Sequence, residues 1–426
     1  MRPSWSRRRT CAALAVAGTI ALAACSSSAA GTGGGSSGGG RGPGGGTITF
    51  GQLLPFTGTK AFLPSWATHG DAAAVYDVNH NGGVMGKTLT SVSADDAGDA
   101  VDAVPALRKL LISNPAFIVG PYSLTVMAVI NEFDPNHVVD YVIGGTTQLD
   151  HMTEKYVYRT TASDSAEVVA MAYYAIHHGY RRAAYIFDNS ANTQGLVQPL
   201  TASYTRQGGT VVANETLVPD QSSYSSEITA AFARHPQVVF AAFDQQTATT
   251  VFADMRQLGD LNVPVVGEDV LGSPGYAKAM GQPQASKYLF TVSGASPGGQ
   301  AYQHYLDDYY AVYHTKQILS SSYNMYDSVI ISALAMTAAH STDPKVWVNY
   351  VTKVSNPPGT ECYTYASCVA LLKAGKKINY EGATGPGDFN AYHNTFSGFA
   401  VSGFNSAGQL VQVAYVTPRQ VQDNAG

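Results

Sequence analysis

Hydroxyl side chains occur in two tight turns that each follow an apolar run, and together they could hold an anion. Ser123 follows the run 116–119, and Thr146 and Thr147 follow the run 138–143 through two glycines. The exposed N–H groups of a strand-to-helix turn and the helix dipole favour a carboxylate there. The two turns could therefore bind a carboxylate without a positively charged side chain. The alternative for Ser123 is a helix N-cap.

One serine lies in the G-x-S-x-G pattern of hydrolases, at residues 294–298. In that pattern the residue after the nucleophile donates its backbone N–H to the oxyanion. Here that residue is Pro297, which has no N–H. The H-E-x-x-H zinc motif does not occur in the sequence, and we expect His177 and His178 to end a helix. We therefore expect no enzymatic activity, no cofactor and no metal site.

The amino-terminal residues have the composition of an export signal. Four arginines precede an apolar run at 11–21, which is shorter than the roughly 20 residues that cross a bilayer. Leu-Ala-Ala-Cys at 22–25 resembles the lipobox of bacterial lipoproteins, which implies a signal peptide at 1–24 and a lipid on Cys25. The protein would then be anchored to the outer face of the cell membrane. Residues 25–46 would form its lipidated end and a flexible Gly/Ser tether.

Two further cysteines, Cys362 and Cys368, lie beyond the tether. In an exported protein we expect a disulfide between them, with two free thiols as the alternative. The net charge is −5 and only 13% of the residues are charged. This composition argues against nucleic-acid binding, which requires a basic surface.

Apolar strands alternate with helical segments along the rest of the chain. Strands are predicted at 48–54, 89–93, 116–119, 138–143, 183–187, 210–217, 238–242, 263–266 and within 396–416. Helices are predicted at 70–79, 100–112, 124–133, 167–177, 193–207, 224–234, 246–258 and over most of 297–354. The alternation predicts an α/β fold with parallel, doubly wound sheets, and two such series predict two lobes.

Ligands of open parallel sheets bind outside the carboxyl ends of the strands. The candidate binding residues are therefore those that follow predicted strands, namely Ser123, Gly144, Gly145, Thr146, Thr147, Asp188, Phe243, Asp244 and Glu268.

Several short motifs recur in an order that is typical of one family. They are LPFTG at 54–58, NHNGGVMG at 79–86, DD at 95–96, IVGPYS at 118–123, GGTT at 144–147, YRT at 158–160, VVGE at 265–268 and YEGATGPGDF at 380–389. In these motifs the chain resembles the substrate-binding proteins of branched-chain amino acid ABC importers, which have the type I periplasmic binding-protein fold. The resemblance implies two Rossmann-like lobes joined by three crossing strands that act as a hinge. The lobes would be residues 47–160 with 294–384, and 161–293 with 385–426.

The same resemblance implies a function. An extracytoplasmic receptor would bind a small molecule between its lobes and deliver it to the permease and ATPase subunits of an importer, and we expect a monomer. A ligand-sensing subunit with the same fold and no transport role is the alternative.

The resemblance also implies roles for single residues. An amino-acid ligand needs polar partners for both its carboxylate and its ammonium when the cleft closes. Ser123, Gly145, Thr146 and Thr147 would hold the carboxylate. Glu268 matches the family's amine-binding glutamate, with Asp244 and Asp269 as alternatives. A side-chain pocket is expected from Trp66, Tyr122, Phe243 and Tyr326.

Three departures from the family's pattern leave the identity of the ligand open. The segment after Asp188 is longer than usual and lacks a tyrosine, the turn before Ser123 carries a bulky Tyr122, and Phe243 stands where a hydroxylated aromatic is usual. We therefore expect an amino acid or a related small carboxylate, without assigning leucine, isoleucine or valine.

Overall fold

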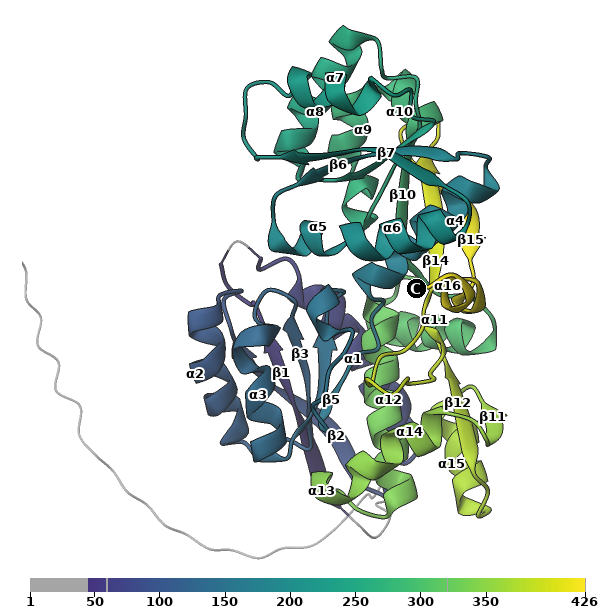
Figure 1. Cartoon of the computed structure of the whole chain (residues 1–426). Coiled ribbons are helices and arrows are strands. Elements are labelled where there is room, and N and C mark those ends of the chain that lie inside the picture. Colours follow the sequence, from purple (N-terminus) through teal and green to yellow (C-terminus); the bar gives the residue numbers. More distant parts are fainter. Residues whose placement is uncertain (1–44, 59, 320, 426) are drawn as a thin grey trace, which may run out of the picture. The chain divides into compact units, whose positions relative to one another are not determined.

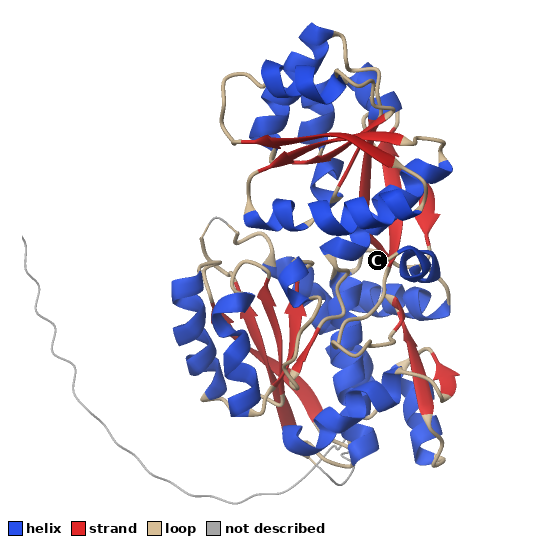
Figure 2. Ribbon diagram, in the orientation of Figure 1, coloured by secondary structure: helices blue, strands red, loops and turns tan. Residues whose placement is uncertain are grey.

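The computed structural model describes residues 45–58, 60–319 and 321–425. It contains two large sheets, each with helices on both faces, which confirms the predicted α/β fold (Figures 1 and 2). The predicted signal peptide and Cys25 lie outside the described residues, as does almost all of the tether. Within the described part of the chain, no helix combines the length and the hydropathy needed to cross a membrane.

The first sheet has five strands in the order β2-β1-β3-β4-β5, and all of its pairings are parallel. Its strands are β1 (Thr47–Leu54), β2 (Thr88–Asp95), β3 (Phe117–Tyr122), β4 (Val139–Ile143) and β5 (Val157–Tyr158). The predicted strands of this half agree with β1 to β4, whereas β5 was not predicted.

The second sheet has seven strands in the order β15-β14-β10-β9-β8-β6-β7. They are β6 (Arg182–Asp188), β7 (Thr210–Leu217), β8 (Val238–Ala242), β9 (Val265–Gly267), β10 (Leu289–Ala295), β14 (Gly398–Phe404) and β15 (Leu410–Val416). The pairings from β7 to β10 are parallel, and β14 and β15 extend the sheet in antiparallel fashion.

Helices connect and cover these strands. They are α1 (Pro64–His80), α2 (Ala100–Leu111), α3 (Val126–Asn136), α4 (Asp164–His177), α5 (Ala191–Gly195), α6 (Val197–Arg206), α7 (Ser225–Phe232), α8 (Gln245–Leu258), α9 (Pro274–Met280), α10 (Gln282–Tyr288), α11 (Gln300–Tyr313), α12 (Ser322–Ala339), α13 (Pro344–Trp347), α14 (Val351–Ser355), α15 (Tyr365–Lys373) and α16 (Pro418–Asn424). Short 3₁₀ turns occur at Thr147–Leu149, Asp269–Gly272 and Val348–Tyr350.

Local sequence explains where several helices begin and end. Asp99 caps α2 by accepting the Val101 N–H at 2.7 Å, and Ser163 caps α4. The helix α8 ends at Gly259, whose φ of 87° is a left-handed conformation that glycine adopts without strain. The prediction that His177 ends a helix is confirmed, because α4 finishes there.

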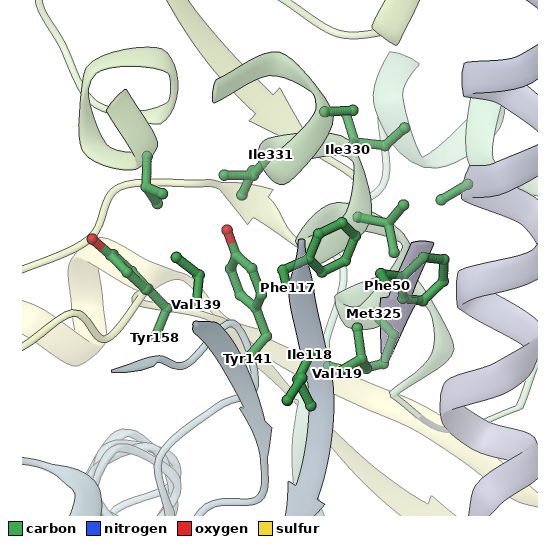
Figure 3. Packing of buried hydrophobic residues seen from close by; sticks show 14 of the residues in the cluster. Phe50, Phe117, Ile118, Val119, Val139, Tyr141, Tyr158, Met325, Ile330 and Ile331 are labelled. Atoms are coloured by element: carbon green, nitrogen blue, oxygen red, sulfur yellow. The ribbon is translucent and has the colours of Figure 1, made fainter. Parts of the chain in front are cut away.

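Part of the core of the first lobe lies between its sheet and α12 (Figure 3), and the same cluster extends to α2 and α3. Phe50 and Phe117 stack with ring centroids 4.8 Å apart, and Tyr141 meets Phe117 edge to face. Residues 322–336 of α12 are all buried, as expected of a helix that is enclosed on every side. α12 also packs beside α1, although the two are far apart in the sequence (Figure 1).

The core of the second lobe has two halves, one on each face of its sheet. Along β6, Tyr185 and Phe187 face the half that includes α4 and α6, whereas Ala184 and Ile186 face the half that includes α7 and α8. This division follows from the alternating direction of side chains along a strand. Both faces are buried, so the strand is apolar throughout.

Three connections join the two lobes: β5 to α4, β10 to α11, and β13 to β14. The last one starts from a small sheet of β11 (Thr360–Cys362), β12 (Ile378–Gly382) and β13 (Gly385–Pro386). In the structure a disulfide joins Cys362 at the end of β11 to Cys368 in α15, with their Cα atoms 5.3 Å apart.

Candidate ligand-binding site

The turn at residues 144–146, which follows β4, lies against Ser123, which follows β3. The Thr146 N–H points at the Ser123 hydroxyl oxygen at 3.5 Å. Gly144 allows this approach, because a Cβ atom there would lie 1.8 Å from that oxygen. Ser123 does not cap a helix, since α3 begins at Val126 and the preceding residue makes no side-chain cap. The Ser123 hydroxyl donates to no described residue, so its proton is free for a ligand.

Arg159 fixes the position of this turn. Its side chain is 1% exposed, and its Nη1 donates to the carbonyls of Gly145 at 3.3 Å and Thr146 at 3.1 Å. Its Nη2 donates to Asp150 at 2.6 Å and its Nε to Asn394 at 2.8 Å. A planar guanidinium can make these bonds in several directions at once, so one side chain holds the turn, the 3₁₀ segment and the third connection together.

The network continues into the start of α4, which packs on the second sheet. Asp150 accepts hydrogen bonds from the hydroxyls of Ser163 at 2.6 Å and Ser165 at 2.5 Å. The Asp164 N–H donates to the Gly145 carbonyl at 2.8 Å. A Cβ atom on Gly145 would lie 1.6 Å from Asp164 Oδ1. Only glycine fits here, and the contact brings a carboxylate of the second lobe to the hydroxyl-bearing turns of the first.

Glu268 directly follows β9, at the carboxyl end of that strand in the second sheet, and its side chain is partly buried. Burial raises its pKa well above the ordinary value, and the negative charges of Asp164, Asp269 and Asp188 raise it further. Burial, followed by the charge of Asp269, raises the pKa of Asp164 to about 6. Such mutual effects require that these carboxyl groups be close neighbours. The structure therefore gathers an acidic group of side chains around Glu268.

Glu167 belongs to this group and was not predicted from the sequence, nor was Asp164. Glu167 is 6% exposed, and its Oε1 accepts the Asp269 N–H at 2.8 Å. Asp164 and Glu167 lie after a connection between the lobes. They were missed because the candidate residues were chosen only among those that directly follow a predicted strand. The available signal was an acid within the otherwise apolar run 166–172.

Two candidates on the second lobe have other roles. The Asp244 carboxylate caps α8, where it accepts the Thr247 N–H at 2.7 Å and its hydroxyl at 3.2 Å. Phe243 is buried in the core, where its ring meets Phe252 edge to face at 6.1 Å. Its ring is therefore part of the core of the second lobe.

Two aromatic candidates of the first lobe lie near Ser123. Tyr122 directly precedes it, and the Tyr122 hydroxyl donates to the Leu63 carbonyl at 2.8 Å, just before α1. Trp66, in the first turn of α1, is half-buried and meets Phe62 edge to face at 6.0 Å. The contact through Leu63 places Trp66 and Tyr122 at the same end of the first sheet.

Tyr326 is not brought to this site. It lies within α12 and donates to Asp77 at 3.0 Å and Asp308 at 2.7 Å. His304 lies 3.3 Å from both carboxylates, and its hydrogen bond with Asp77 raises its pKa. The potential metal-ligand atoms of Asp77, His304 and Asp308 lie within 4.8 Å of one another. Their partners are each other and Tyr326, which suits a polar connection between α1, α11 and α12.

The serine of the G-x-S-x-G pattern is also engaged within the chain. The Ser296 hydroxyl donates to the Ala383 carbonyl at 2.6 Å and accepts the Gly298 N–H at 3.1 Å. The first of these bonds ties the second connection between the lobes to the turn between β12 and β13.

A cavity of about 520 Å³ lies beside the candidate site and is lined by residues of both lobes, including Thr147, Arg159, Ser163 and Gly195. Its lining contains neither Ser123 nor Glu268. Its most polar group, the Arg159–Asp150 pair, is already satisfied internally, so the sheet edges are the better candidate for ligand binding.

Comparisons with known proteins identify the family of this chain. Residues 47–409 match the family profile described as periplasmic binding protein. A Leu/Ile/Val-binding protein of Rhizobium johnstonii, BraC3, is 28% identical over 251 residues, which are 57% of this chain and 67% of that protein. A chemotactic signal transduction system substrate-binding protein of Halobacterium salinarum, BasB, is 26% identical over 88% of this chain and 92% of that protein.

Solved structures share the fold at lower identity. The branched-chain amino acid transporter substrate-binding protein LivJ of Streptococcus pneumoniae, in complex with isoleucine, is 20% identical with a TM-score of 0.66, over 87% of this chain and 99% of that one. A solute-binding protein of an ABC transporter from R. palustris, in complex with benzoate, is 19% identical with a TM-score of 0.65, over 88% and 97%. With its two lobes, its three connections and a family match over most of its length, this chain belongs to the periplasmic binding protein family.

Proposed function

We propose that this chain is the solute-binding lipoprotein of an ABC importer and that it binds an amino acid or a related small carboxylate between its lobes. Ser123 and the turn at 144–147 receive the ligand carboxylate. Glu268 receives the ammonium, and Trp66 and Tyr122 bound the side-chain pocket. Rotation of the lobes about their three connections closes the site around the ligand.

The observation that carries this proposal is the contact between Gly145 and Asp164. It brings hydroxyl and N–H groups on one lobe against carboxylates on the other. Both ends of an amino acid must exchange water for polar partners when they are buried. The turns of the first lobe offer hydrogen-bond donors to the ligand carboxylate. The carboxylates of the second lobe offer acceptors to the ligand ammonium.

Glu268→Gln tests the proposal, because it keeps the shape of the side chain and removes its charge. Leaving the buried ammonium without its partner should weaken binding by about 3 kcal/mol. The measurement is isothermal titration calorimetry with the amino acid that most stabilises the wild type. Glu227→Gln, a change of a half-buried residue on α7, is the control. An unchanged dissociation constant for Glu268→Gln would remove this residue from the site.

Delivery to a permease is supported by the importer proteins among the similar structures, whereas BasB favours a second candidate. In that alternative the closed receptor signals to a membrane partner without transport. Deletion of the gene separates the two functions. Loss of uptake of the radiolabelled ligand supports import, and unchanged uptake with a lost behavioural response supports sensing.

The lipid anchor rests on the sequence at residues 22–25. We expect the full chain to fractionate with membranes and Cys25→Ser to accumulate as an unprocessed precursor. Processing and membrane attachment that continue unchanged in Cys25→Ser would contradict the anchor.

A further inference from the structure

Lysine side chains gather at one end of the first lobe. Residues 345–377 contain five exposed lysines and a single acid, Glu361, which accepts the Tyr363 hydroxyl at 2.6 Å. The lysines are Lys345, Lys353, Lys373, Lys376 and Lys377. The rest of the chain is acidic, because the net charge of the whole is −5 even though the predicted signal peptide and tether contribute only arginines.

The fold brings three of these lysines around one cavity. Lys353 on α14 and the pair Lys376 and Lys377 between α15 and β12 line a cavity of about 440 Å³, whose other walls are largely apolar. The Lys353 ammonium lies 4.3 Å from the centre of the Tyr350 ring, which lines the same cavity. We call these three lysines the lysine cluster.

The lysine cluster is not neutralised within the described part of the chain. No carboxylate there forms an ion pair with any of its three ammonium groups. All three side chains are exposed, and their charges add because they surround one cavity. An anionic surface that contacts all three at once would gain from each of them.

The described chain begins at this end of the lobe. Thr47 at the start of β1 and Ala116 just before β3 line a surface cavity together with Pro344 of α13. Figure 1 shows α13 beside the start of β1, and the 3₁₀ turn Val348–Tyr350 joins α13 to the cavity of the lysine cluster. A lipid on Cys25 would therefore hold this end of the lobe toward the membrane, across a Gly/Ser segment whose length spans roughly 25 Å on average.

The chemistry of the cluster and its place beside the anchor identify the partner. A lysine-rich surface next to a membrane binds the phosphate groups of anionic lipids, and each lysine near them strengthens binding about 5-fold. Acyl chains and a basic surface together hold a protein on a membrane more firmly than either one alone.

We propose that the lysine cluster binds the anionic lipid surface of the membrane that carries the anchor. The inference rests on the proposed lipid anchor and adds the orientation of the folded body. The cluster lies toward the amino ends of the strands of the first sheet, whereas Ser123 and the turn at 144–147 lie at the carboxyl ends. Between those ends β1 runs for 8 residues, or about 25 Å. The candidate site would then face away from the membrane and remain open to solutes.

The experiment is co-sedimentation of the mature chain, residues 25–426, with vesicles. The chain is made without its signal peptide and therefore without lipid, and all described residues belong to one compact unit to which the signal peptide does not contribute. Vesicles of phosphatidylcholine are compared with vesicles of phosphatidylcholine and an equal amount of phosphatidylglycerol. We expect binding to the anionic vesicles that is more than about 10-fold tighter and that weakens as sodium chloride is added.

Variants then assign the binding to the lysine cluster. The combination of Lys353→Gln, Lys376→Gln and Lys377→Gln should lower the affinity for the anionic vesicles more than about 10-fold. Lysine-to-arginine substitutions at the same three positions keep the charge and should leave the affinity unchanged.

The matched control removes three exposed lysines elsewhere, by combining Lys109→Gln, Lys278→Gln and Lys287→Gln, and should keep most of the affinity. Equal losses in the cluster variant and the control would show a response to overall charge and would overturn the proposal. Equal binding to both kinds of vesicle would overturn it as well. Binding to neither kind would assign the lysines to a protein partner and would also overturn it.

The outcomes separate this proposal from the proposed function. Because the tested chain carries no lipid, its binding to vesicles does not depend on acylation of Cys25, which the Cys25→Ser precursor decides. The cluster variant should also bind the amino-acid ligand with the affinity of the wild type by calorimetry, because the candidate site lies at the other ends of the strands. A loss of ligand affinity in this variant would overturn the proposed orientation.

Discussion

Asp140 is an acid without a partner in the core of the first lobe. It lies in β4, is fully buried, and neither carboxylate oxygen accepts a hydrogen bond from a described residue. Burial raises its pKa well above the ordinary value. The folded chain therefore keeps this proton at a pH where the unfolded chain has lost it.

Because of this difference, Asp140 lowers the free energy of unfolding as the pH rises above about 4, the ordinary pKa of aspartate. Asp140→Asn removes the titration. The stability of the variant relative to the wild type should then increase with pH by at most about 1.4 kcal/mol per unit, up to the folded-state pKa. Urea denaturation at several pH values measures this, with the exposed Asp102→Asn as control. A relative stability that is independent of pH would contradict a protonated Asp140.

Residues of the candidate site could be predicted only where a strand end implied them. Ser123, Thr146 and Glu268 follow apolar runs and lie at the carboxyl edges of their sheets. Tyr326 was expected in a pocket because it is aromatic, and Phe243 because it is aromatic and follows a strand, but their rings lie within packed cores. Asp164 was missed because its importance depends on its contact with Gly145 of the other lobe, and Glu167 because its importance depends on its contact with Asp269, about a hundred positions away.

At the scale of elements, the Arg159 network joins the turn after β4 to α4 and to the third connection. Arg159→Lys keeps the positive charge but cannot reproduce the planar set of bonds. We expect a loss of about 2 kcal/mol in the free energy of unfolding, because buried carbonyl groups lose their donors. Ligand affinity should also fall, because the turn at 144–146 loses its support.

Denaturant unfolding and calorimetry measure these two effects, and Arg181→Lys provides the matched control. Arg181 is exposed and bonds the Gln207 carbonyl at 2.7 Å, so its replacement should change neither quantity. Full stability and affinity in Arg159→Lys would show that the network does not position the site.

The long elements were predictable from hydrophobic pattern, and the short ones were not. The strands β1, β4 and β8 agree with apolar runs whose ends lie within a residue or two of the predictions. β5 has two residues and β13 has two, too few to show any alternation. The predicted helix at 193–207 is instead two helices, α5 and α6, which meet at Leu196.

At the scale of the whole molecule, the alternation of strands and helices was sufficient to predict two doubly wound lobes. The contacts between distant segments were beyond reach of the sequence pattern, because they bring together side chains more than a hundred positions apart, such as Glu167 and Asp269 within the second lobe. The acidic group around Glu268 arises from such contacts. The fold was therefore more predictable than the ligand.

Binding of an amino-acid-like solute is the central claim, and one measurement tests it directly. The thermal stability of the ligand-free full chain is recorded against the common amino acids and a set of small carboxylates. A ligand that binds only the folded state adds about 2.7 kcal/mol of stability at about 100 times its dissociation constant. We predict a rise in Tm that increases with concentration for at least one amino acid, and no change with any compound would contradict the claim.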